Sequence, residues 1–181
     1  MLLAAIFFTG ATQNLMMILP LVIGAVCMLG SVIATFFVKL GASQSIMGAL
    51  YKGFIASAVL SLIALYFVTD WVVGLETAYS FGTFSFTGMT LYICGIVGLA
   101  VTGFIIWVTE YYTGVNFRPV KSIAAASETG HGTNVIQGLA VSMEATALPA
   151  IIIVIGILIA FNLAGLFGIA IAVTTMLALA G

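Results

Sequence analysis

The chain has 181 residues, of which 64% are apolar and 5% are charged, and its mean hydropathy is +1.35. Because soluble domains carry roughly 25% charged residues, this composition excludes an ordinary soluble domain and indicates an integral membrane protein. The formal net charge of −1 argues against nucleic acid as a partner, since a nucleic-acid surface needs clustered lysine and arginine.

The first half of the chain predicts two full membrane crossings. Residues 1–8 are apolar but too short to cross a bilayer, which takes about 20 residues, so we expect the end of a helix there. A polar turn is expected at 9–14. The first crossing covers residues 16–38, with Pro20 in or near its first turn, where a missing N–H does little damage. The second crossing covers residues 49–68.

The third crossing covers residues 89–108 and follows a mixed stretch at 72–88, which we expect to be a loop in the headgroup region. Gly95, Gly98 and Gly103 give this crossing a face of small residues. Such a face lets a neighbouring membrane helix approach closely, so we expect helix packing there.

Two further apolar runs close the chain, and a tight turn is expected between them at 162–165. The sequence therefore predicts an all-α integral membrane fold, in which residues 1–181 are one partial transmembrane domain. It has four full transmembrane helices and partial helices at both ends, and we expect it to be a fragment of a larger bundle. The expected crossings are 16–38, 49–68, 89–108, 148–163 and 166–179.

Between the third and fourth crossings lies a polar segment, residues 109–146, which holds half of the cations, three of the five acids and the only histidine. Unpaired backbone groups are costly in hydrocarbon, so this segment is either a loop on one membrane face or the lining of a wet cavity. Pro119 fits the first position of a helix. Asn134 is predicted to cap a second helix, with Gln137 completing a capping box. That helix is expected to run on into the fourth crossing with a bend at Pro149.

The distribution of charge predicts which way the chain crosses the membrane. If the crossings alternate, all four cations fall on one side, whereas Asp70 and Glu76 fall on the other. The positive-inside rule then places the loop at 111–145 in the cytoplasm. The four cations are Lys39, Lys52, Arg118 and Lys121.

Four charged residues are candidates for coupling or structural support: Glu110, Arg118, Lys121 and Glu144. Glu110 lies at the lipid boundary, where a carboxylate is costly unless paired or wet, so it is either functional or an interfacial anchor paired with a cation. Arg118 and Lys121 either meet an anion or contact lipid headgroups. Glu144 is expected to be a buried partner for one of these cations. His131 is either a proton shuttle or a turn residue. No catalytic residue and no metal site is predicted, because that chemistry needs convergent carboxylates.

Several runs of the sequence resemble the membrane-integral, ion-pumping inorganic pyrophosphatases, in their bacterial, proton-pumping-like branch. The segments TEYYT and TGHGTNVIQGLA are the most specific, and the likeness continues in LPLVIGAVCMLGSVIATFFVKLG, IMGALYKGFIASAVLS and LAGLFGIAIAVTTML. The resemblance implies a homodimer with about sixteen transmembrane helices per subunit. It also implies magnesium-dependent hydrolysis of pyrophosphate, coupled to outward pumping of protons or sodium. On that mapping, the polar loop joins the ninth and tenth helices on the cytoplasmic side.

The resemblance leaves the hydrolytic centre outside this chain. The aspartate-rich motifs of the family are absent, and the one aspartate is Asp70. Since magnesium ions around a pyrophosphate want several carboxylates, we expect the magnesium ligands elsewhere and the chain alone to be inactive. The family position that carries over is Glu110 of the TEYYT motif, an expected support for coupling or folding.

The leading hypothesis is therefore a part of a pyrophosphate-energised proton pump in the bacterial inner membrane. Its partners would be inorganic pyrophosphate, protons and the lipid bilayer. The alternative is a non-enzymatic helical membrane scaffold or channel module, or an inactive truncated copy.

Overall fold

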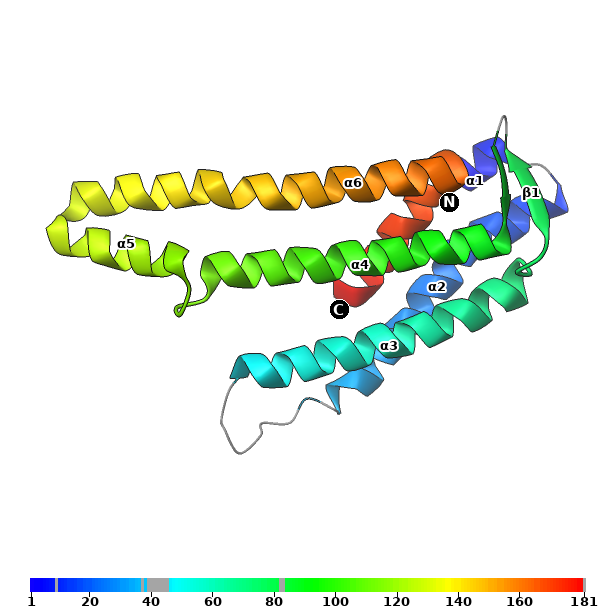
Figure 1. Ribbon diagram of the computed structural model, residues 1–181. Coiled ribbons are helices and arrows are strands. Elements are labelled where there is room, and N and C mark those ends of the chain that lie inside the picture. The colour runs from blue at the N-terminus through cyan, green and yellow to red at the C-terminus, as the bar shows by residue number, and fades with distance from the viewer. Residues whose placement is uncertain (9, 37, 39–45, 82–83, 181) are drawn as a thin grey trace. The chain divides into compact units, whose positions relative to one another are not determined.

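The computed structural model describes residues 1–8, 10–36, 38, 46–81 and 84–180. Helices dominate these residues, and one two-stranded hairpin lies among them (Figure 1). The elements are α1 (Leu2–Phe7), α2 (Ala11–Thr35), α3 (Ile46–Val72), β1 (Ala78–Phe81), β2 (Phe84–Thr87), α4 (Gly88–Thr113), α5 (Arg118–Thr129) and α6 (His131–Ala180).

Within the described residues, four helical stretches are long and apolar enough to cross a membrane: Thr12–Thr35, Gly48–Val72, Gly88–Thr129 and His131–Leu177. A helix satisfies its own backbone hydrogen bonds, which is what the hydrocarbon core of a bilayer requires. The all-α membrane class expected from the sequence is therefore confirmed.

The chain divides into two compact units. The first comprises Met1–Leu99 and Ile157–Gly181, and the second comprises Ala100–Gly156. Helices α4 and α6 contribute residues to both units. All of the polar segment between the third and fourth expected crossings falls in the second unit.

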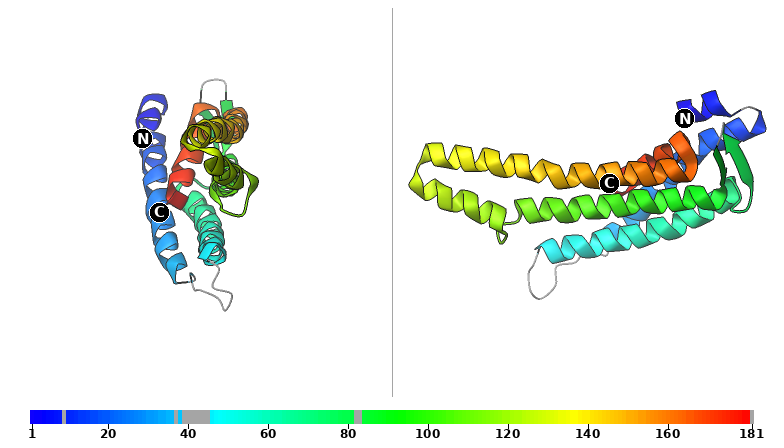
Figure 2. Two further views of the ribbon diagram at one scale, coloured as in Figure 1. Left: turned by 90° about the vertical axis from the view of Figure 1, so that its left-hand side faces the viewer. Right: turned by 45° about the horizontal axis from the view of Figure 1, so that its top comes forward.

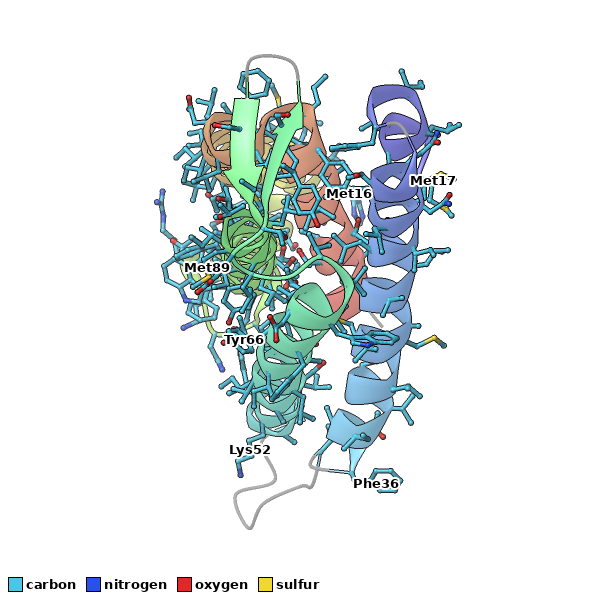
Figure 3. The ribbon with its side chains drawn as sticks, turned by 90° about the vertical axis from the view of Figure 1, so that its right-hand side faces the viewer. Met16, Met17, Phe36, Lys52, Tyr66 and Met89 are labelled. Carbon is cyan, nitrogen blue, oxygen red and sulfur yellow. The ribbon has the colours of Figure 1, made fainter. Side chains whose placement is uncertain are left out.

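In the first unit, α2 and α3 pack against each other and run in opposite directions. Figure 3 shows Phe36 and Lys52 at one end of this pair, with Met16 and Met17 toward the other end. Met16 is fully buried. The buried core around it draws on α1, α2, α3, the hairpin, α4 and the last part of α6, and it includes Phe8, Met16, Leu19, Ile23, Leu65, Phe86, Leu91, Phe167 and Ile171.

The region expected to be a loop in the headgroup region contains an antiparallel hairpin, so the expected loop conformation is wrong for residues 78–81 and 84–87. Its place in the headgroup region stays a prediction. Tyr79 pairs with Phe86 and Ser80 pairs with Ser85 across the two strands. Phe86 is buried, and its ring stacks on Phe167 at a centroid distance of 6.2 Å. Pairing of the strands satisfies backbone groups, while alternate side chains turn toward the core.

Glycines bring α4 close to the last part of α6 in the first unit. A Cβ added at Gly98 would overlap the carbonyl oxygen of Ala172 and the hydroxyl of Thr175. Thr175 Oγ1 donates to the Gly95 carbonyl oxygen of α4 over 3.2 Å. The expected close packing therefore occurs at Gly95 and Gly98. A Cβ at Gly103, by contrast, would meet nothing within 4 Å among the described atoms.

The start of α2 differs from expectation. Helix α2 begins at Ala11, so the polar turn expected at 9–14 is wrong from Ala11 onward. Gly10 precedes the helix with φ of 71°, a left-handed conformation that glycine adopts at little cost, and the turn is made there. Pro20 consequently lies well inside the helix, not in its first turn.

Helix α6 runs without a break from His131 to Leu163, because its non-helical dihedral angles fall at Ala164 and Gly165. Backbone dihedrals stay helical at Pro149, so the expected bend is not seen there. The break at Ala164 and Gly165 lies where the tight turn was expected. Gly165 has φ of 59°, which suits a glycine.

Candidate functional site

The four predicted site residues all lie in the second unit. Glu110 is in the last turn of α4 and is half-buried. Arg118 and Lys121 are exposed in the first turn of α5, and Glu144 is exposed on α6. Figure 2 shows α5 and the beginning of α6 lying side by side. The structure thus places these residues on three helices of a single unit.

A tyrosine connects two of these helices. The Tyr112 hydroxyl on α4 donates to Glu144 Oε1 on α6 over 3.4 Å. The Tyr112 side chain is half-buried. The expectation that Glu144 is buried is wrong, because its side chain is exposed and its hydrogen-bond donor is a phenol.

The turn from α4 into α5 is held by aromatic rings. Tyr111 lies 5.4 Å from Phe117 and 5.1 Å from Tyr112, measured between ring centroids. A Cβ at Gly114 would lie 2.8 Å from the Phe117 ring and 2.9 Å from the Glu110 carbonyl oxygen. The chain therefore needs a residue without a side chain at position 114 to place α5, and with it Arg118, beside the end of α4.

Helices α5 and α6 are joined by side-chain hydrogen bonds near their shared turn. Gln137 Nε2 donates to Ser122 Oγ over 3.2 Å. Thr133 Oγ1 donates to the Ala126 carbonyl oxygen over 2.9 Å, and the hydroxyls of Thr129 and Thr133 lie 2.8 Å apart. These contacts hold the first turns of α6 against α5.

The predicted capping box at Asn134 and Gln137 is wrong. Helix α6 begins at His131, and Asn134 already donates its backbone N–H to the Gly130 carbonyl oxygen over 3.2 Å. Pro119 does lie in the first turn of α5, as predicted. His131 is exposed and directly follows Gly130, which breaks the helix with φ of 138°. His131 therefore lies at the turn between α5 and α6, which is where the turn-residue alternative places it.

Sequence reasoning missed Tyr112, Ser122 and Thr133 as residues that connect helices. None of them is charged, and pairs such as Ser122 and Gln137 are 15 positions apart in the chain. One available signal was the spacing of Thr129 and Thr133, which would place them on one helix face. The break at Gly130 falls between them, so that pattern alone could not establish their contact.

Side chains that commonly bind metal ions lie apart from one another in the described part of the chain. Among them, no three histidine, cysteine, aspartate or glutamate side chains come together in a way that could hold one. The divalent metal that the resemblance implies therefore does not fit the residues described. The roles of Glu110, Arg118, Lys121 and Glu144 stay predictions.

These features define a polytopic helical membrane protein, whose charged residues are concentrated around a short helical turn between two long apolar helices. The family model described as inorganic H+ pyrophosphatase matches residues 1–181. The chain belongs to this family of membrane proton-pumping pyrophosphatases.

Three curated relatives show the extent of the similarity. The chain is 58% identical over 183 residues to "Pyrophosphate-energized proton pump 2" of Mycoplana dimorpha, a match that covers 100% of this chain and 88% of the relative. It is 58% identical over 179 residues to the protein of the same name from Rhizobium leguminosarum bv. trifolii, covering 98% and 83%. It is 39% identical over 170 residues to the "K(+)-insensitive pyrophosphate-energized proton pump" of Methanosarcina mazei, covering 90% of this chain but 23% of that relative.

Proposed function

We propose that the chain forms part of a pyrophosphate-energised proton pump, in which hydrolysis of inorganic pyrophosphate drives protons across a membrane. The observation that carries this proposal is the family match over residues 1–181, with 58% identity to curated relatives that bear this name. The four membrane-length helices within the described residues support it.

The hydrolytic centre, with its magnesium ions, lies outside this chain in our proposal. The sequence contains one aspartate, Asp70, and none of the aspartate-rich motifs of the family. Hydrolysis at two metal ions requires several carboxylates on one site. This chain then contributes a helical wall of the membrane domain, and its polar helical turn contributes to support or coupling.

Within that wall, Glu110 is the residue for which we propose a coupling or supporting role. Its side chain is half-buried at the end of α4, and its carbonyl oxygen accepts the Gly114 N–H over 2.7 Å where the chain turns into α5. Arg118, Lys121 and Glu144 are proposed to support the same turn. The protein is proposed to be a homodimer in the bacterial inner membrane.

A chimera tests the proposal. The segment of the Methanosarcina mazei relative that aligns with this chain is replaced by the aligned 90% of this chain. Pyrophosphate-driven proton uptake is then measured in membrane vesicles with magnesium. We expect the chimera to retain hydrolysis and uptake. The chain expressed alone should insert into the membrane and hydrolyse no pyrophosphate. Hydrolysis by the chain alone, or an inserted chimera without any hydrolysis, would contradict the proposal.

The role of Glu110 is tested in the same chimera. Glu110→Gln removes a charge at the lipid boundary, where an ionised carboxylate is retained only at a cost. We expect proton uptake to fall several-fold. The matched control is Glu128→Gln, which changes an exposed acid of α5 in the same unit and should leave uptake unchanged. Equal uptake by both variants would remove Glu110 from the coupling machinery.

A further inference from the structure

Hydroxyl groups gather where α2 and α3 pack in the first unit. Ser31 and Thr35 are four residues apart on α2, and Ser57 and Ser61 are four residues apart on α3. Residues four apart lie on one face of a helix. Ser31, Thr35 and Ser57 line one groove, and a Cβ added at Gly30 of α2 would lie 4.0 Å from Ser61 Oγ.

One of these hydroxyls is buried without a hydrogen bond. Ser57 is 7% exposed and its Oγ has no partner among the described residues, whereas Ser61, which is 1% exposed, lies beside the Cys27 thiol of α2. The other hydroxyls on these helices behave differently. Ser31 donates to the Met28 carbonyl oxygen over 2.9 Å, and Thr35 donates to that of Val32 over 2.7 Å. Bonding back to the preceding turn is the usual solution for such residues, and Ser57 and Ser61 do not use it.

The groove beside Ser57 has a volume of about 180 Å³ and a mostly apolar wall that carries three hydroxyl groups. Besides Ser31, Thr35 and Ser57, its lining comprises Ala34, Val38, Leu50, Gly53 and Phe54. A site holds water when it offers enough space and two or more polar partners, and this groove meets both conditions. A lipid chain would fill the space but would leave the Ser57 hydroxyl unpaired in an apolar surrounding.

We propose that this groove is a hydration site, which holds water against Ser31, Thr35 and Ser57 within the membrane-spanning part of α2 and α3. The groove lies toward the end of the helix pair that carries Phe36 and Lys52 (Figure 3). Ser31 and Thr35 already donate to their own helix, so their oxygens accept hydrogen bonds from the water, while Ser57 both donates and accepts. The proposal concerns access of solvent and does not depend on the pumping reaction.

Cysteine labelling tests this proposal in membranes that contain the protein. Cys27 and Cys94 are first replaced by alanine, and a single cysteine is then introduced as Ser57→Cys. A small charged methanethiosulfonate reacts with thiolates, which form only where water reaches the thiol. The matched control is Ile55→Cys, two residues away at nearly the same depth, whose native side chain is 58% exposed on the outside of the unit. We expect Ser57→Cys to react about tenfold faster or more than this lipid-facing control.

A second pair of cysteine variants keeps the test valid if Ser57→Cys does not fold. Ser31→Cys, from the other wall of the groove, is compared with Leu29→Cys, whose native side chain is 64% exposed. Faster labelling of Ser31→Cys supports the hydration site. If both groove cysteines label as slowly as their controls, water does not enter. If they label only after denaturation in detergent, another segment of protein fills the groove. Either result overturns the proposal.

Discussion

At the scale of single residues, the distance between α4 and the last part of α6 depends on Gly98, which has no side chain. Gly98 faces the Ala172 carbonyl oxygen and the Thr175 hydroxyl with no room for a Cβ. Thr175 is itself buried, and its one hydroxyl proton is shared between the carbonyl oxygens of Ala172, at 2.8 Å, and Gly95, at 3.2 Å, so it cannot turn away freely. Five residues along the same helix, Gly103 faces open space.

We therefore predict opposite results for two alanine substitutions in α4. Gly98→Ala should lower the stability by about 1–3 kcal/mol, because overpacking forces the helix backbones apart. Gly103→Ala should be neutral or slightly stabilising, by no more than about 1 kcal/mol, because alanine favours a helix over glycine. The thermal midpoint of each purified variant in detergent measures the difference. Equal midpoints would mean that the contact between α4 and α6 is not close-packed in the protein.

At the scale of elements, the turn between α5 and α6 is made by one glycine. Gly130 has φ of 138°, whereas Gly132 lies inside the first turn of α6, where a Cβ would meet nothing within 4 Å. A non-glycine residue in such a sparsely populated backbone conformation is strained by roughly 1–3 kcal/mol. The hydrogen bonds of Thr133 across the same turn leave the chain little freedom to rearrange.

These two glycines give a second matched prediction. Gly130→Ala should make the turn more sensitive to limited proteolysis and should lower the thermal midpoint, in keeping with about 1–3 kcal/mol of strain. Gly132→Ala should protect the turn or leave it unchanged. If Gly132→Ala were the more damaging of the two, the turn would have to be placed one or two residues later.

The same elements show what sequence patterns can and cannot establish. Long apolar runs predict long helices well, because hydrocarbon admits only backbone that bonds within its own segment. The predicted start of α6 at Asn134 is wrong, although Asn134 and Gln137 match a capping pattern. Gly130 ends α5 earlier in the chain, and the Gln137 side chain donates to Ser122 instead. Such a choice depends on which residue lies opposite in space. The sequence signal for the hairpin is weak. Aromatic residues alternate with serine around Ser80 and Ser85, but each strand has only four residues.

Candidate site residues were harder to place than helices. The TEYYT and TGHGTN segments pointed to the right family, which the match over residues 1–181 confirms. They did not reveal that Tyr112 reaches Glu144 across two helices. Contacts between residues 32 positions apart leave no periodic signal in a single sequence.

At the scale of the whole molecule, the direction of insertion is a prediction that rests on the four cations, of which Lys39 lies outside the described residues. A cysteine at Thr129 should react with a membrane-impermeant thiol reagent only from the cytoplasmic side, and one at Thr77 only from the opposite side. Both native side chains are exposed. Labelling after permeabilisation serves as the control for access. Reaction of both positions from one side would mean that the stretch between them does not cross the membrane, and exchange of the two sides would reverse the predicted orientation.

The part of α6 in the second unit, His131–Gly156, is longer than a membrane crossing requires. At 1.5 Å per residue, these residues span about 39 Å, and a bilayer's hydrocarbon layer is about 30 Å thick. A helix of this length that crosses the layer therefore extends about 10 Å beyond it. Because its backbone dihedral angles stay helical throughout, a force on the turns that begin at His131 is transmitted to the residues in the lipid without a hinge.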